Sequence, residues 1–303
     1  MSKPIENRAH GRPLVSIGVP AYNAERFIGR ALDSLLAQTL SDFEVIISDN
    51  ASTDETGALC EDYARRDRRI RYVRQTSNIG APRNWNFVVH EARGEFFKWS
   101  SASDYCSPLM LELCVKSMQA DLGVVLCYGK TQYVDEEERP IRVYDREVGF
   151  EEERPSERFA HICAKMTINN LQCGLFRLDA LRRTRLDRLY PSGDLALMAE
   201  LTLYGRFRML PEILLFRCES RDTSTAMIAP LERQRVYEPH ATRAIKLILV
   251  RRYLDNLASI RRAPISIAEK ANAYRRILRL MRWDRGRIGR EFLSLIGFHI
   301  DTN

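Results

Sequence analysis

Long apolar runs and metal-ligand patterns are scarce in this sequence of 303 residues. No apolar run approaches the roughly 18 residues of a membrane-spanning helix, so we expect no such helix. The polar residues 1–12 lack the apolar centre of a signal peptide. The five histidines show no His-x-x-x-His spacing, which argues against a metal site built from histidines.

Disulfide and zinc patterns are missing as well. The seven cysteines are odd in number and form no Cys-x-x-Cys pair. Most stand in apolar stretches, where a thiol packs like a small hydrophobic group. The cysteine usage therefore predicts a protein of a reducing cytoplasm rather than a disulfide framework or a zinc site.

Three signatures of common enzyme classes are absent. The first strand is not followed by Gly-x-Gly-x-x-Gly, which argues against a dinucleotide-dependent dehydrogenase. The sequence also contains no Gly-x-x-x-x-Gly-Lys-[Ser/Thr], which argues against a P-loop enzyme. Without Gly-x-Ser-x-Gly, an α/β hydrolase is not expected either.

The basic excess lies in one part of the chain. The formal net charge is +7, but residues 231–303 hold 16 Lys and Arg against 7 Asp and Glu, which leaves 1–230 at −2. We expect a polar arm at 1–12, an α/β domain at 13–228 and a basic helical region at 229–303.

The basic region leaves several partners open. Its apolar residues are interleaved with arginines, so its helices are expected to pack on the α/β domain, to form a dimer contact, or to lie on an anionic membrane. The membrane alternative would place the protein at the inner face of the membrane, near a lipid-linked acceptor. No recognised nucleic-acid module is present, so no nucleic-acid partner is expected.

Strands alternate with helices in the first half of the sequence. The expected strands are Leu14–Val19, Phe43–Ile47, Ile70–Val73, Phe96–Trp99 and Val124–Tyr128. Helices are expected after an Asn23 cap, after the capping box Ser52–Glu55, and from Pro82 and Pro108. This alternation predicts parallel strands in an α/β sandwich, while 206–217 is expected to form two short strands around Pro211.

Four polar segments follow the expected strands: Pro20–Asn23, Asp49–Asp54, Asn78–Asn84 and Ser100–Tyr105. Because ligands bind at the carboxyl ends of parallel strands, these segments should meet in one crevice. An Asp there accepts from a base N–H, and an Arg reaches a diphosphate. The residues expected to line this crevice are Tyr22, Asn23, Asp49, Asn50, Asn78 and Arg83.

The segments 15–23, 45–54, 78–84 and 170–216 together resemble the family-2 glycosyltransferases. The resemblance implies a GT-A fold: an α/β/α sandwich with a mixed, mainly parallel sheet, here followed by helices. It also implies a nucleoside-diphosphate-sugar donor and an acceptor hydroxyl. Pro20, Tyr22 and Asp49 would hold the base, with Arg83 near the base or the phosphates, although Asp49 also suits a turn.

The sequence departs from this family at the metal-binding motif. By the resemblance, the usual acidic triplet becomes Ala102, Ser103 and Asp104, and only the last carboxylate remains for the donor and for Mg²⁺ or Mn²⁺. Ser220 stands where relatives often place a histidine. The alternative is that basic side chains neutralise the diphosphate instead of a metal; the candidates are Arg217, Arg221 and Lys98.

Asp194 is the candidate catalytic base. The family places an acidic residue at this point, and the resemblance implies an inverting displacement in which Asp194 takes the proton of the acceptor hydroxyl. Asp194 also suits a helix N-cap, and Glu200 is a second, weaker candidate for the base. The reduced acidic motif leaves one further alternative: a nucleotide-sugar-binding protein with weakened catalysis.

Overall fold

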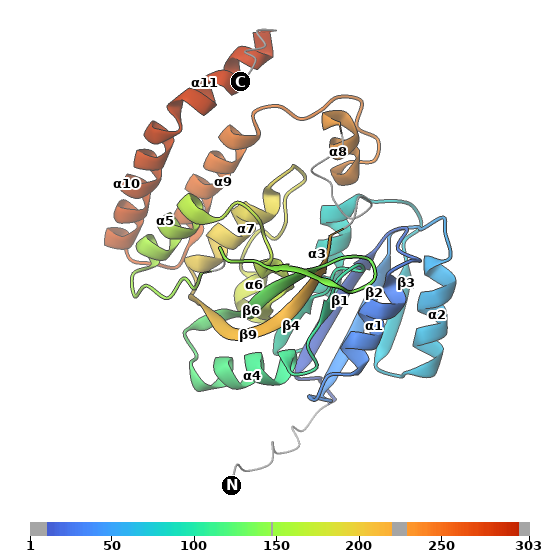
Figure 1. Ribbon diagram of the computed structural model, residues 1–303. Helices are drawn as coiled ribbons and strands as arrows, with labels where there is room; N and C mark the ends of the chain where they lie inside the picture. The colour runs from blue at the N-terminus through green and yellow to red at the C-terminus, as the bar shows by residue number, and fades with distance from the viewer. Residues whose placement is uncertain (1–10, 147, 220–228, 297–303) are drawn as a thin grey trace.

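The computed structural model describes residues 11–146, 148–219 and 229–296 (Figure 1). Its strands are β1 (Val15–Ala21), β2 (Phe43–Asp49), β3 (Ile70–Arg74), β4 (Phe96–Trp99), β5 (Tyr105–Cys106), β6 (Val124–Val134), β7 (Pro140–Val143), β8 (Leu175–Arg177) and β9 (Arg206–Cys218). They form one sheet in the order β3-β2-β1-β4-β8-β6-β9-β5, with β7 paired to β6.

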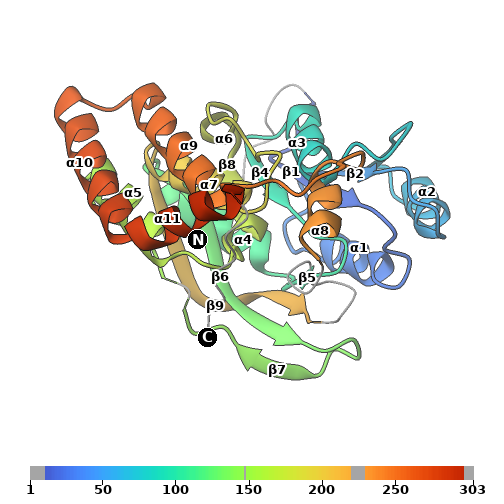
Figure 2. The same cartoon turned by 90° about the horizontal axis from the view of Figure 1, so that it is seen from above.

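Helices cover both faces of this sheet (Figures 1 and 2). Their bounds are α1 (Ile28–Leu36), α2 (Thr56–Arg66), α3 (Ala81–Glu91), α4 (Met110–Ala120), α5 (Pro155–Lys165), α6 (Leu178–Arg182), α7 (Gly193–Thr202), α8 (Pro230–Tyr237), α9 (Ile248–Arg262), α10 (Ile267–Trp283) and α11 (Arg285–Leu293). The architecture is the expected α/β/α sandwich followed by helices.

The sheet separates two hydrophobic cores. On β2, Ile46 faces one core with α3, whereas Val45 and Ile47 face the other with α1. Successive side chains of a strand point to opposite faces, so a strand buried on both sides carries a continuous apolar run. The parallel pairing of β1 with β2 and β4, and of β2 with β3, follows from that double burial.

The five expected strands are confirmed. Four of them agree with the expected bounds to within two residues, and β6 continues to Val134. The expected division of 206–217 is wrong, because β9 runs unbroken through Pro211. Its pairing with β6 shifts register between Tyr128 and Lys130, and Gly129 leaves room there for the Glu212 carbonyl oxygen, which lies 2.5 Å from where a Cβ atom would be.

The two expected helix caps near Asn23 and Ser52 are also wrong. Helix α1 begins at Ile28 and α2 begins at Thr56, and neither has a side-chain cap. Asn23 and Ser52 bind across the gap between their loops instead: the Asn23 N–H donates to Ser52 Oγ at 3.0 Å, and the Thr53 N–H donates to Asn23 Oδ1 at 2.9 Å. A tertiary contact has taken the place of the local caps.

The C-terminal helices pack on the α/β part through one face. Helix α9 lies against α7, and α10 lies against α5 (Figure 1). Tyr253, Ile260 and Ile277 of these helices belong to the same hydrophobic core as α3 and α7. Packing, the first of the three alternatives for the basic region, is therefore present. Within the described ranges, no helix is both long and apolar enough to cross a bilayer.

Candidate active site

A cavity of about 560 Å³ opens at the carboxyl ends of the parallel strands. Pro20, Tyr22 and Asn78 line it as expected, and Tyr22 is 48% exposed. The sequence interpretation also named Asn50, which lines the cavity too. Ala81 and Asn84, from the expected segment Asn78–Asn84, line it as well. The wall that the sequence interpretation missed consists of Trp85, Glu232, Arg235, Val236 and Pro239.

Helix α8 closes one side of this crevice. It packs beside α3, well apart from α9 to α11 (Figure 1). The loop before α3 allows this close approach, because Gly80 has φ +85° and a Cβ atom there would lie 2.3 Å from the Tyr237 carbonyl oxygen. Only glycine adopts this backbone conformation readily. Residues of the basic region thus form part of the crevice.

The loop of Asn78 is held by its own polar groups. Asn50 Nδ2 donates to Asn78 Oδ1 at 2.9 Å, and the Gly80 N–H donates to the same oxygen at 2.9 Å. The Ile79 N–H donates to Asn50 Oδ1 at 2.8 Å. Asn50 and Asn78 therefore fix the loop that precedes α3, and the two residues form one edge of the cavity.

Asp49 lies beneath the crevice rather than in it. Its side chain is fully buried, and its carboxylate accepts from Arg74 Nη1 at 2.7 Å, from the Ser52 N–H at 2.8 Å and from the Tyr72 hydroxyl at 2.8 Å. Burial, together with the Asp49 hydrogen bond, raises the pKa of Tyr72 to about 12. In this arrangement Asp49 holds the end of β2, and its contact with a base stays a prediction.

Two further predicted residues do not line the cavity. Asn23 spans the two loops described above, and its side-chain oxygen is used by Thr53. Arg83 is exposed on the first turn of α3, where it donates to the Ile79 carbonyl oxygen at 3.3 Å. Their contacts with a nucleotide also stay predictions.

Asp104 directly precedes β5, the strand that pairs with β9. It is buried, and its Oδ1 atom accepts from the Cys218 N–H at 3.2 Å and from Ser103 Oγ at 3.4 Å. Burial raises the pKa of Asp104, although the charges of Arg217 and Lys98 oppose that shift. Asp104 and its neighbour Ser103 lie outside the lining of the cavity, and their contacts with a donor or a metal stay predictions.

Asp194 lies on the first turn of α7 and is half-buried. Ser192 occupies the N-cap position, so the alternative of an Asp194 cap is wrong. Asn169 Nδ2 donates to Asp194 Oδ2 at 3.0 Å. Burial raises the pKa of Asp194, although the Asn169 hydrogen bond opposes the shift, and a carboxylate with a raised pKa is a stronger base.

Two neighbours add to the electrostatics around Asp194. The pKa of Asp187 is raised well above its usual value, first by burial and then by the negative charge of Asp194. The pKa of Tyr237 is raised by burial, with the charges of Asp194 and Asp187 adding to it. Since Tyr237 ends α8, that helix reaches from the crevice wall to the vicinity of the candidate base.

Glu200 does not offer a second base. Its side chain is fully buried, and it pairs with Arg188 at 3.2 Å and with Arg262 at 2.8 Å. A carboxylate held by two guanidinium groups inside the protein stabilises packing between α7 and α9 and is closed to an acceptor.

The sequence interpretation missed a polar group beside Asp194. Asn169 also donates to Gln172 Oε1 at 3.3 Å, and Arg217 Nη1 donates to Asn170 Oδ1 at 2.6 Å. Gln172 Nε2 is buried and has no hydrogen-bond partner within the described ranges. The signal in the sequence is the polar run around 169–172 before β8, which matched the family pattern without a role assigned to it.

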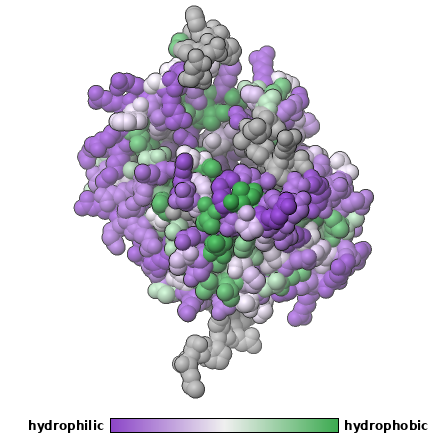
Figure 3. Space-filling model, in the orientation of Figure 1, coloured by the Kyte–Doolittle hydropathy of each residue, from purple (hydrophilic) through white to green (hydrophobic). Residues whose placement is uncertain are grey.

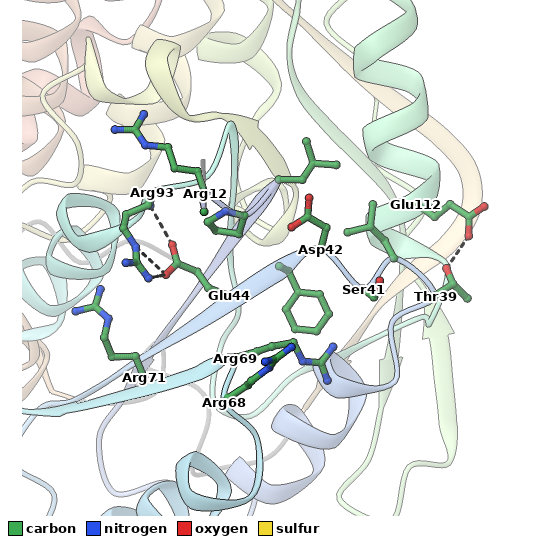
Figure 4. A pocket seen from close by; sticks show the side chains of 15 residues that line it. Arg12, Thr39, Ser41, Asp42, Glu44, Arg68, Arg69, Arg71, Arg93 and Glu112 are labelled. Atoms are coloured by element: carbon green, nitrogen blue, oxygen red, sulfur yellow. Dashed lines mark hydrogen bonds and ion pairs between the residues drawn. The ribbon is translucent and has the colours of Figure 1, made fainter. Parts of the chain in front are cut away.

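A larger cavity of about 980 Å³ opens at the opposite, amino end of the strands (Figure 4). Its charged groups are mostly paired: Arg93 binds Glu44 at 2.7 Å, and Arg69 lies over the Phe43 ring at 4.4 Å. Ligands of parallel α/β sheets bind at the carboxyl ends, so its size does not make it the candidate site.

Comparison with known proteins identifies the fold and the family. The model of glycosyl transferase family 2 matches residues 16–184, which is more than half of the chain. An uncharacterized glycosyltransferase EpsJ of Bacillus subtilis (strain 168) is 43% identical over 116 residues, 38% of this chain and 33% of that protein. Chondroitin synthase of Escherichia coli is 34% identical over 125 residues, 41% of this chain and 18% of that protein.

The chain thus matches a third or less of the length of these two relatives. Among solved structures, Staphylococcus aureus TarS 1–349 in complex with UDP gives a TM-score of 0.63 at 19% identity, covering 90% of this chain and 73% of that one. Mannosyltransferase PcManGT of Pyrobaculum calidifontis, in complex with GDP-Man and Mn2+, gives 0.53 at 19% identity, covering 87% and 74%. The chain has the GT-A fold and belongs to glycosyl transferase family 2.

Proposed function

We propose that this glycosyltransferase moves a sugar from a nucleoside-diphosphate sugar to an acceptor hydroxyl with inversion at the anomeric carbon. The observation that carries the proposal is Asp194, a half-buried carboxylate at a helix start, held by one amide and raised in pKa by burial. It is partly exposed, and its basicity suits proton removal.

The reaction is a single displacement. The acceptor oxygen attacks the anomeric carbon while its proton passes to Asp194, and the bond from that carbon to the diphosphate oxygen breaks. The electron pair of that bond leaves with the nucleoside diphosphate. Asn169 orients the Asp194 carboxylate through its 3.0 Å hydrogen bond.

The crevice beside Tyr22 is the proposed place of the nucleoside. Tyr22 offers an exposed aromatic ring, and Asn50 and Asn78 offer an amide edge beside it. Neighbouring structures hold UDP or GDP-Man, so both nucleotides are candidates, and we propose a UDP sugar first. Thermal stabilisation by UDP, GDP and dTDP separates them, since a ligand that binds the folded state raises its stability.

Asp194→Asn tests the reaction. The variant should lose roughly 10²- to 10⁴-fold in the transfer rate, the usual contribution of a general base, and should keep nucleotide binding. Release of nucleoside diphosphate from the sugar donor, measured with an acceptor panel, reports the rate. Asp179→Asn is the matched control, because Asp179 is an exposed carboxylate paired with Arg183. An Asp194→Asn variant as fast as wild type would refute the assignment.

The same assay decides the second candidate function, a nucleotide-sugar-binding protein with weakened catalysis. The observation in its favour is the reduction of the acidic triplet to Asp104, which is buried and accepts from the Cys218 N–H. Tight donor binding without turnover on any acceptor would support it over the enzyme.

We further propose that the enzyme acts in polysaccharide or glycolipid synthesis at the cytoplasmic face of a membrane. On the outward side of α10 and α11, Trp283 is 88% and Phe292 is 50% exposed, among exposed arginines such as Arg279 and Arg282. This side of the molecule is mostly hydrophilic in Figure 3. Aromatic rings within a basic surface suit an anionic bilayer.

Pelleting of the full chain with vesicles tests this location. Vesicles rich in phosphatidylglycerol should retain it at low salt and release it at high salt, whereas phosphatidylcholine vesicles should not bind it. The absence of binding to anionic vesicles at low salt would refute the membrane contact. A concentration-dependent dimer in the same buffer would favour a dimer contact through the basic region.

A further inference from the structure

The residues around Asp104 do not fit the divalent metal that the fold family implies. Within the described ranges, no group of three His, Cys, Asp or Glu side chains is placed to hold a metal ion. Asp104 follows Ala102 and Ser103, and its Oδ1 atom already accepts two hydrogen bonds. One buried carboxylate is a poor ligand set for Mg²⁺ or Mn²⁺, which prefer several oxygen ligands.

Arg217 joins the two segments that bind the candidate carboxylates. The Cys218 N–H donates to Asp104 at 3.2 Å, and the preceding residue, Arg217, donates to Asn170 at 2.6 Å. The residue before Asn170 is Asn169, which donates to Asp194 at 3.0 Å. The Arg217 side chain therefore holds the segment that binds Asp104 to the segment that binds Asp194.

The guanidinium of Arg217 still has charge to offer. It is half-buried and takes part in no ion pair within the described ranges, since its hydrogen bond goes to a neutral amide. Its positive charge acts on the carboxyl groups of Asp104 and Asp194 and opposes the rise of both pKa values. A divalent cation at Asp104 would have to approach this positive charge, which disfavours its binding.

Of the other sequence candidates, Lys98 is less suited to this role. Lys98 is buried, and its Nζ atom donates to the Trp99 and Cys173 carbonyl oxygens, each at 2.9 Å. It stabilises the core beneath Asp104 and has no path to a ligand. Arg221, and the Ser220 that replaces the family histidine, lie outside the described residues.

We propose that Arg217, rather than a divalent cation, neutralises the diphosphate as it leaves the sugar. This proposal rests on the proposed function. When the bond from the anomeric carbon to the diphosphate oxygen breaks, that oxygen takes the electron pair and gains one negative charge. Arg217 stays protonated and stabilises this charge, because a guanidinium fork fits phosphate oxygens and transition-state charge is stabilised best by prepositioned donors.

Rates with and without metal test the proposal on the full chain. The wild-type rate of diphosphate release in EDTA should stay within about twofold of the rates in Mg²⁺ and Mn²⁺. Arg217→Gln should lose roughly 10²- to 10³-fold in kcat, the usual cost of removing one such donor, without rescue by Mn²⁺. Arg217→Lys should recover part of the loss, since a point charge replaces the fork.

The matched control is Arg183→Gln, which removes an exposed arginine directly after α6 and should keep the wild-type rate. A melting temperature within a few degrees of wild type shows that Arg217→Gln folds. Loss of the wild-type rate in EDTA, with recovery on Mn²⁺ addition, would overturn the proposal and leave the glycosyltransferase standing.

Binding of UDP or GDP in EDTA gives a second readout that needs no turnover. The wild type should be stabilised by the nucleotide, and Arg217→Gln should be stabilised much less. If the wild type binds the diphosphate but transfers no sugar, the proposed function fails. The binding comparison then still tests whether Arg217 binds the diphosphate. A wild type that binds diphosphates only with Mn²⁺ refutes the role of Arg217, and one that binds none contradicts both proposals.

Discussion

Two aspartates at the same edge of the sheet are held in opposite ways. Asp49, in the first half of the chain, is fully buried and receives hydrogen bonds from Arg74, Ser52 and Tyr72. Asp194, in the second half, is half-buried, and one side-chain amide, that of Asn169, binds it. Contacts within the protein take up the Asp49 carboxylate, whereas Asp194 is partly exposed and is the proposed base.

The surroundings of the two aspartates also differ in how far apart their residues lie along the chain. The edge near Asp49 is built from contacts within residues 43–84, which settle the loops before any ligand arrives. The group near Asp194 is assembled from β9, α7, α8 and the segment before β8. Burial raises the pKa of Asp194, which is the direction expected for a carboxylate that acts as a base.

The strongest test of the contrast replaces each aspartate by asparagine. Asp194→Asn should nearly abolish transfer and leave the melting temperature equal or higher, because its buried carboxylate is costly when ionised. Asp49→Asn should lower the free energy of unfolding by about 1–3 kcal/mol, as a buried group loses its partners. Calorimetry and the rate assay measure both effects.

If Asp49→Asn instead kept full stability and lost only nucleotide affinity, the base contact predicted from the sequence would be correct and the structural role secondary.

Gly80→Ala tests how the two halves meet. An alanine at φ +85° is strained, and its Cβ atom would press on the Tyr237 carbonyl oxygen, so α8 must move. We expect a loss of at least about 1 kcal/mol in unfolding free energy and weaker nucleotide binding. Gly289→Ala on α11 is the control and should raise the unfolding free energy, since nothing lies within 4 Å of its Cβ position and alanine favours a helix.

An unchanged stability and affinity in Gly80→Ala would show that α8 is not needed for the crevice. The nucleotide site would then consist of residues from the α/β part alone.

Asp187→Asn is expected to give the smallest effect and to keep the pH profile. Because burial raises the pKa of Asp194, the rate should fall on acidification at a higher pH than for an ordinary aspartate. The charge of Asp194 raises the pKa of Asp187, so Asp187 keeps its proton, and is neutral like asparagine, while Asp194 titrates. The acid limb should therefore stay in place in the variant.

The stability of this variant should not fall below that of the wild type. An acid whose pKa is raised in the folded state binds its proton more tightly there, so its ionisation costs stability once the pH rises above the unfolded pKa. Asp187→Asn removes that cost and should melt no lower than wild type at neutral pH. An acid limb that moves to lower pH would show that Asp187 is ionised while Asp194 titrates.

The strands and the crevice were predictable because their signals are local. The apolar runs of β1, β2 and β4 need only neighbouring residues to be recognised, and the polar residues that follow them must gather where parallel strands end. The caps at Asn23 and Ser52 failed for the opposite reason, since residues 29 and 30 positions apart took those polar groups.

By itself, then, the sequence determined the sandwich, the family and the edge of the sheet that carries the site. Only the tertiary structure decided which polar groups face a ligand there. It buried Asp49 under Arg74, brought α8 to the crevice, and set Arg217 against Asn170, 47 residues away along the chain. Periodicity records the face of each element, but a side chain's partners depend on which elements the fold places beside it.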